Sequence, residues 1–418
     1  MASKITARQA HEQGRRAAEQ AMADKVRGDI YKNLDHNIQW ARIAYMGVAE
    51  VDLRQELLRF SRERMASDPD LAKYPECRGM RELVEAQREG FATVVDDPVA
   101  VAAHFDWYWF CSRRLNTRFV GKSPQPSRCT SIWFPDTKEG GPICASNLDD
   151  VLFRYGKDSH RPPATGGRDW RITEITCVGG VSAAVLCDEE PDCLFPVHLD
   201  WIMPDDIKDL REHMAFMERY REFWGPGNQL WVDPDMNFVA VEKANIRMGV
   251  RYSERYAATT ACAYLTPEMN AFKKERDRLS FKARGWTEDC PDAVYWDGCE
   301  QRYRRLLRLV ERHARQGPTL IRAAQIALDH SVPFPERICL AGEKGHPQEK
   351  LQNWTLSSSA HCVSGPNRRV LWWGIDPTDP RPIYKTSCHV IPGEGLEHRK
   401  AEWEREVAEA GEIGLSPG

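Results

Sequence analysis

Hydrophobic and polar positions divide this chain into two parts. In residues 1–112, apolar side chains recur every three or four positions, as in IQWARIAYMGV, LRQELLRFSRERM and MRELVEAQREGF. That spacing predicts amphipathic helices. From Cys129 onward, short alternating runs dominate, which predicts strands with helices between them. We therefore expect an α+β protein, with a helical N-terminal segment over 1–128 and a β-rich domain over 129–418.

The two parts meet at a segment with the composition of a linker. Residues 115–128 are rich in Pro, Ser and Thr and contain one Gly, which is typical of a loop. Downstream we predict hairpins over 169–187 and 228–243 and a helix from Pro204 to Phe223. A strand followed by a loop is expected over 247–269. Two helices are expected within 299–330, then three strands, and a charged helix from about Leu396.

The most informative stretch is SRCTSIWFPDTKEGGPICASNLDD at 127–150. Two β-prone runs flank the turn residues Gly140–Pro142, which predicts a hairpin. Such a hairpin brings Cys129 close to Asn147 and Asp149 on the returning strand. A nucleophile and polar groups at one strand end are what covalent acyl chemistry needs.

This stretch resembles the self-processing N-terminal-nucleophile (Ntn) hydrolases of the acyl-coenzyme A:isopenicillin N (6-aminopenicillanic acid) acyltransferase type. Their motif is Cys-Thr-Thr/Ser, a turn, and Asn-x-Asp. By resemblance Cys129 is the nucleophile and Asp149 is the Asp of the second motif. Further matches follow in family order: Thr173, Glu174 and Gly179, then Gly227, Asn228, Asp233 and Glu242. A looser match follows at Thr355, Ser358 or Ser359, Gly374 and Pro377.

The resemblance implies a four-layer αββα sandwich from Cys129, with 1–128 as the smaller chain after cleavage between Arg128 and Cys129. The family has Gly where this chain has Arg128. It also has an oxyanion-binding Asn where this chain has Thr260, whose hydroxyl can donate one hydrogen bond.

Three positions of the hairpin have a structural as well as a functional interpretation. Asp149 either caps a turn beside Asn147 or orients a catalytic amine. Thr130 and Ser131 are either ordinary strand residues or hydroxyls that assist the amine or the oxyanion. Both interpretations remain open for each position.

The implied chemistry uses the α-amine that cleavage would free on Cys129. Its ordinary pKa of about 8 suits it as a base beside the thiol. The expected activity is cleavage of an amide, or acyl transfer, through a Cys129 thioester. No cofactor or metal is expected, and a coenzyme A thioester is a possible acyl donor. Two alternatives remain: an uncleaved, inactive binding protein of the same fold, and a hydrolase that uses Cys129 as an internal nucleophile with a histidine.

Composition and charge limit the classes of binding partner that we expect. The formal charge of −4 gives no support to nucleic-acid binding, and no apolar run approaches the roughly 20 residues of a membrane span. The charged start of the chain lacks the apolar segment of a secretory signal, and the 13 cysteines form no CxxC pair. We therefore expect reduced thiols and a cytoplasmic protein. The expected partners are a small amide or acyl substrate and, after cleavage, the chain's own two fragments.

Overall fold

The computed structural model describes most of the chain. The described residues are 5–24, 29–45, 48, 51–67, 73–115, 129–151, 176–177, 195–205, 207, 209–224, 227–233, 235–244, 247–260, 263–287, 289–333, 336–340, 353–376 and 381–411. The predicted linker therefore lies outside them, apart from its first residue, and so does most of the predicted hairpin over 169–187.

The N-terminal segment is helical, as its apolar spacing predicts. Its helices are α1 (Ala7–Met22), α2 (Ile30–Ala44), α3 (Leu53–Ala66), α4 (Met80–Ala92) and α5 (Pro98–Trp109), with the short turns η1 (Pro75–Cys77) and η2 (Phe110–Leu115). Polar residues begin several of them: Thr6 and Gln9 form a capping box on α1, and Asp97 caps α5 before Pro98. These caps satisfy backbone N–H groups that a helix start leaves unpaired.

The backbones of helices α1 and α4 are in direct contact. A Cβ atom added at Gly14 would lie 1.8 Å from the carbonyl oxygen of Gln87, and one added at Gly90 would lie 1.9 Å from that of His11. Only glycine fits at either position, because any side chain would push the helices apart. The two glycines therefore fix how closely this pair packs.

From Cys129 onward the chain forms two antiparallel sheets. The six-stranded sheet has the order β10-β9-β8-β2-β1-β7 and the four-stranded sheet β3-β4-β5-β6. Their strands are β1 (Thr130–Phe134), β2 (Ile143–Val151), β3 (Thr176–Cys177), β4 (Gly227–Val232), β5 (Phe238–Ala244), β6 (Arg247–Tyr252), β7 (Ala257–Thr260), β8 (Asn353–Cys362), β9 (Arg369–Gly374) and β10 (His389–Pro392).

The helices of this part lie between strands along the chain, except α12, which follows the last strand. They are α7 (Leu199–Ile202), α8 (Leu210–Arg219), α9 (Pro267–Arg284), α10 (Pro291–Gln316), α11 (Leu320–Ala327) and α12 (Lys400–Glu409). The chain is thus α+β. The predicted hairpins at 127–150 and 228–243, the last three strands and the final helix are confirmed.

Two predictions about elements were wrong, and one helix was missed. The helix predicted from Pro204 begins at Leu210, because the Asp209 side chain accepts a hydrogen bond from Glu212 N and caps it there. Residues 247–269 contain two strands, β6 and β7, and these belong to different sheets. Helix α9 was not predicted.

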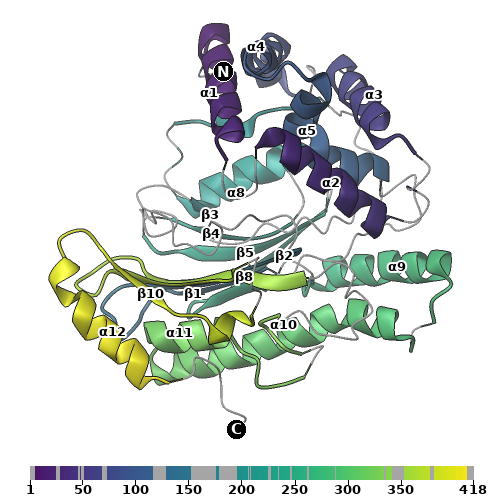
Figure 1. Ribbon diagram of the computed structural model, residues 1–418. Coiled ribbons are helices and arrows are strands. Elements are labelled where there is room, and N and C mark those ends of the chain that lie inside the picture. Colours follow the sequence, from purple (N-terminus) through teal and green to yellow (C-terminus); the bar gives the residue numbers. More distant parts are fainter. Residues whose placement is uncertain are drawn as a thin grey trace.

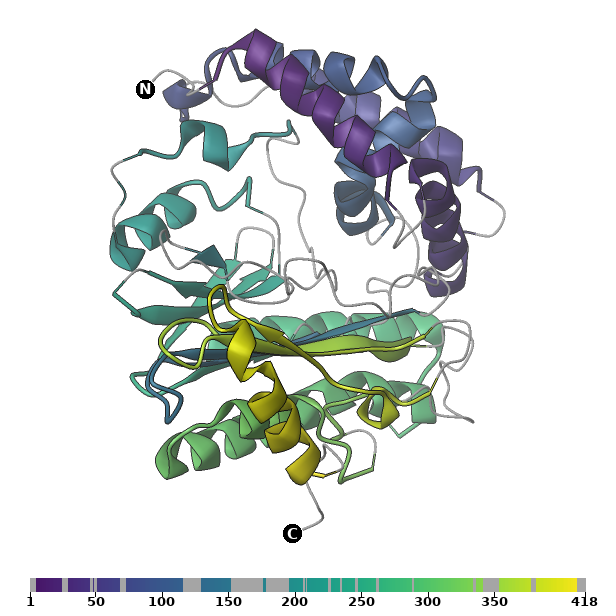
Figure 2. The same ribbon diagram turned by 60° about the vertical axis from the view of Figure 1, so that its left-hand side comes forward.

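The two sheets face each other, and helices cover their outer sides (Figure 1). Between the sheets lies a cluster of apolar residues from both, including Trp133 and Cys144 of one sheet and Leu230 and Val232 of the other. Below the six-stranded sheet, a larger cluster joins it to α10, α11 and α12. Above the four-stranded sheet, Val239 and others pack against α8 and the N-terminal helices. The N-terminal helices and α10–α12 thus lie at opposite ends of the molecule (Figure 2).

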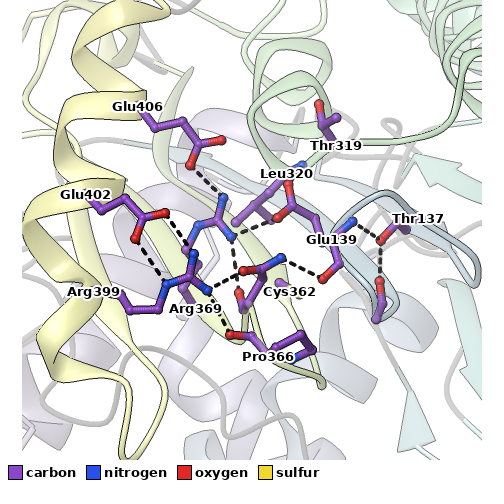
Figure 3. Close-up of polar contacts among 12 residues, drawn as sticks. Thr137, Glu139, Thr319, Leu320, Cys362, Pro366, Arg369, Arg399, Glu402 and Glu406 are labelled. Carbon is purple, nitrogen blue, oxygen red and sulfur yellow. Dashed lines mark hydrogen bonds and ion pairs between the residues drawn. The ribbon is translucent and has the colours of Figure 1, made fainter.

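The turn end of the β1–β2 hairpin is tied to α11 and α12 by a polar network (Figure 3). Glu139, in that turn, accepts hydrogen bonds from Leu320 N at 2.9 Å and from the Arg369 guanidinium at 2.8 Å. Arg369 also pairs with Glu406 of α12 at 3.0 Å. This network holds the hairpin at the end that lies away from Cys129.

Helix α8 carries a buried histidine on the side that faces the four-stranded sheet. His213 is 4% exposed, and its ring lies 4.4 Å from that of Trp231. Within the described residues neither ring nitrogen has a hydrogen-bond partner. Burial lowers the pKa of His213 to about 4, so the folded protein holds it neutral.

We expect this histidine to make the fold sensitive to acid. Below the unfolded pKa of 6.5, the unfolded chain takes up a proton that the folded chain refuses until about pH 4. Stability is therefore full above pH 6.5 and falls between 6.5 and 4, by roughly 2 kcal/mol between pH 7 and pH 5 for this one group. In urea unfolding, His213→Phe should lose less free energy of unfolding between pH 7 and pH 5 than the wild type does, by about that amount. The exposed His398→Gln variant should keep the wild-type loss, and an equal loss in His213→Phe would refute the assignment.

Candidate functional site

Cys129 lies directly before β1 and is 7% exposed. The hairpin register pairs Thr130 with Asn147, so the start of β1 lies beside the end of β2. The Cys129 Sγ is 3.6 Å from the backbone oxygen of Asp149. The predicted proximity of Cys129 to the end of the returning strand is therefore confirmed.

Asp149 is the centre of a fully buried polar cluster. Its Oδ2 accepts a hydrogen bond from the Nη2 of Arg302, on α10, at 2.8 Å, and both side chains have no exposed surface. Its Oδ1 accepts one from the Thr355 hydroxyl of β8 at 2.7 Å. The same Arg302 nitrogen lies 3.3 Å from the Thr130 hydroxyl oxygen. Asp149 is thus held by side chains from two other elements and is not only a local turn cap.

A bulge in β8 brings Thr355 opposite Asp149. Ser357 pairs with Leu148, but the next pair is Thr355 with Asp149, which leaves Leu356 as an extra residue. A bulge of this kind turns a side chain to the other face of the sheet. Without it, the apolar Leu356 would face the carboxylate. Sequence alternation alone does not predict such a shift.

The 328–340 segment completes the surroundings of Arg302. The backbone oxygen of Ile338 accepts a hydrogen bond from Arg302. That loop is held by Asp329, whose backbone oxygen accepts bonds from Ile338 N and Cys339 N at 3.1 and 3.0 Å. The Asp329 carboxylate in turn pairs with Arg305 at 2.6 Å. Two arginines one turn apart on α10 therefore fix both the carboxylate and the loop that faces it.

Sequence reasoning missed Arg302, although a signal was present. Arg302 lies four residues before Leu306 and eight before Val310, and all three are fully buried. Positions at this spacing share one face of a helix. An arginine within an otherwise apolar stripe has to find a buried acid, and Asp149 is that acid.

The remaining candidates lie close to Cys129 in sequence or register but face different neighbours. Thr260 pairs with Thr130 across β7 and β1. The Asn147 amide donates to the backbone oxygen of Ala327, so it faces α11. Strand alternation turns Ser131 to the opposite face, toward the four-stranded sheet. Of the six residues predicted for the site, Thr130 and Asp149 meet at Arg302, and Cys129 contacts the backbone of Asp149.

Asn228 of β4 joins the two sheets near this point. It is 1% exposed, and its amide nitrogen donates to the backbone oxygens of Thr260 and, at 2.7 Å, of Ala263. It therefore fixes the backbone at the end of β7, next to the strand that begins after Cys129.

Cys339 differs from Cys129 in its surroundings. It is completely buried, and burial together with the negative charge of Asp149 raises its pKa to about 12. A thiol with that pKa stays protonated at neutral pH and is a poor nucleophile. Cys339 therefore serves in packing beside the carboxylate.

Two broader features complete the description of the site. Among the residues that the structure describes, no group of three His, Cys, Asp or Glu side chains is placed to hold a metal ion. In the same residues, no helix has the length and apolar character needed to cross a membrane. Comparison of the sequence with models of known protein families and with curated proteins gives no match.

Proposed function

We propose that the protein is a self-processing cysteine hydrolase or acyltransferase of the Ntn type, with Cys129 as nucleophile. The observation that supports this most is the buried Asp149–Arg302–Thr355 cluster at the start of β1, directly beside Cys129. A fully buried ion pair next to a cysteine at a strand end is an arrangement that catalysis can use. In the proposed mechanism, the fixed carboxylate of Asp149 would orient the freed α-amine of Cys129.

The layer order supports the same proposal. Helices, the four-stranded sheet, the six-stranded sheet and helices follow one another (Figure 1). This is the order that an αββα Ntn sandwich would have, with the nucleophile at the start of a strand in one sheet. The described N-terminal helices pack against the four-stranded sheet and α8, so they suit the smaller chain of a cleaved protein.

Self-processing proceeds in two steps. The Cys129 sulfur attacks the carbonyl carbon of Arg128, the C–N bond breaks, and the nitrogen leaves as the α-amine of Cys129. Water then hydrolyses the thioester between Arg128 and the sulfur, giving the Arg128 carboxylate and a free thiol. The amine next to that thiol becomes the base for substrate turnover.

Substrate turnover repeats this chemistry. The amine takes the proton of the Cys129 thiol, and the thiolate attacks the acyl carbon of an amide or of a coenzyme A thioester. The amine or thiol of the substrate leaves with a proton. Water or a second amine then attacks the new thioester, which gives hydrolysis or acyl transfer.

Intact-mass spectrometry of the purified protein tests the proposal. We expect two chains, residues 1–128 and 129–418, that elute together from a sizing column. An apolar cluster with residues from α4 and α8 joins them, and the Tyr74 hydroxyl donates to Glu222 at 2.7 Å. An intact chain that is fully active would refute the amine mechanism and favour an internal nucleophile. An intact, inactive chain would favour a binding protein of the same fold.

A further inference from the structure

The space between the two sheets changes from apolar to polar along β1. At the Trp133 end it is filled by an apolar cluster that includes Cys144, Leu230 and Val232. Strand alternation places Ser131 and Cys129 on the same face of β1 as Trp133. These two positions, of which Ser131 is 0% and Cys129 7% exposed, continue that face of the strand beyond the apolar cluster.

The first of these positions belongs to a row of hydroxyl groups, which we term the hydroxyl row. Register pairs Ser131 with Thr259 on one side and with Ser146 on the other, and Ser146 with Ser359. The hydroxyl row thus crosses four adjacent strands: β7, β1, β2 and β8. The Ser146 and Ser359 oxygens lie 3.4 Å apart. Hydroxyls both donate and accept, so the partly exposed members of the row, Ser146 and Ser359, can bind either kind of polar group.

Part of this face is accessible, although it belongs to central strands. Ser146 and Leu148 on β2, and Ser357 and Ser359 on β8, are all partly exposed. Their neighbours on the other face, Asn147 and Ser358 among them, are buried. In the described residues, these central strands are thus exposed only on their inner face. Leu148 lies at the register position next to Cys129, so the exposed face leaves space for a ligand beside the nucleophile.

A second, independent observation comes from the opposite sheet. The Asn228 side chain is almost fully buried between the sheets, with its nitrogen bonded to two backbone oxygens. Within the described part of the chain, its Oδ1 accepts no hydrogen bond. A buried carbonyl oxygen without a donor costs stability. A ligand with an O–H or N–H group would supply the hydrogen-bond donor that the Asn228 Oδ1 lacks.

We infer that the space beside Cys129 binds a short acyl group that carries a hydroxyl or amide donor, and not a long aliphatic chain. This inference rests on the proposed function, because the thioester would hold the acyl group of the substrate there. The group is short because Trp133, which is fully buried, closes the space four strand residues away, about 13 Å along β1. The hydroxyl row and the Asn228 oxygen bind its polar end.

Isosteric amides of one amine test the inference. Glycolyl and propionyl p-nitroanilides differ only in OH against CH3, as do the lactoyl and isobutyryl compounds. For the wild type, kcat/KM should be about tenfold higher for the hydroxylated member of each pair, because a site built to bind a hydroxyl rejects the analogue without it. A decanoyl anilide should be a poor substrate.

Variants of the hydroxyl row identify the source of this preference. The double variant Ser146→Ala/Ser359→Ala should lower the ratio to about two or less. Ser253→Ala, an exposed serine between β6 and β7, should keep the wild-type ratio. An unchanged ratio in the double variant, a wild-type preference for propionyl, or rapid decanoyl turnover would overturn the inference while the proposed function stands. If Cys129→Ala turns over these amides as fast as the wild type, the proposed function fails, and the inference fails with it.

Discussion

Replacement of Cys129 by alanine should abolish both self-cleavage and turnover. Alanine has no nucleophilic atom, so neither the thioester to Arg128 nor that to a substrate forms. The fold should survive, because trimming one sulfur costs only about 1 kcal/mol. Mass spectrometry should show one uncut chain, and circular dichroism should match that of the wild type.

Two further cysteine variants control this experiment. Cys144→Ala removes a fully buried sulfur from the cluster between the sheets. It should cost about 1 kcal/mol of stability and leave cleavage and turnover in place. Cys129→Ser should cleave slowly, because a hydroxyl is a weaker nucleophile than a thiol at neutral pH. Full activity in Cys129→Ala, or a substrate adduct on another cysteine, would overturn the assignment of the nucleophile.

The wild-type adduct on Cys129 also separates the two proposed reactions. Acyl-coenzyme A thioesters and small N-acyl amides should add the mass of the acyl group to the fragment that begins at Cys129. If the adduct decays at one rate with or without added amines, the reaction is hydrolysis. If amines accelerate the decay and carry away the acyl group, the protein is an acyltransferase.

Replacement of Asp149 by asparagine should lower both turnover and stability. The Arg302 guanidinium, which has no exposed surface, would then lack its carboxylate. A buried charge left without its partner destabilises a protein by about 3–5 kcal/mol. Turnover should fall by about two orders of magnitude, as expected when a group that orients a catalytic base is lost. Urea unfolding and initial rates measure the two effects.

A double variant distinguishes catalytic positioning from mere support of the fold. In Asp149→Asn/Arg302→Met the unpaired charge is gone, so much of the stability should return. Turnover should stay low if Asp149 orients the α-amine of Cys129. Recovery of turnover together with stability would show that the pair is only structural.

Local pattern was sufficient to predict the hairpin that carries the candidate nucleophile. Alternation on both sides of Gly140–Pro142 sets the pairing of β1 with β2, and with it the proximity of Cys129 to Asp149. Pairing across a short turn depends on nearby residues alone. The helical N-terminal segment was predictable for the same reason, because the spacing of apolar residues reports which face of a helix is buried.

The groups that hold Asp149 are decided only by the tertiary structure. Arg302 and Thr355 lie 153 and 206 residues along the chain from it. Thr355 reaches Asp149 only because of the bulge at Leu356. A strict alternation of side chains along β8 would place Thr355 on the opposite face of the sheet. The pairing of β6 and β7 into different sheets is equally hidden from local pattern. Contacts between distant segments follow from which faces pack together, and no spacing within one segment carries that information.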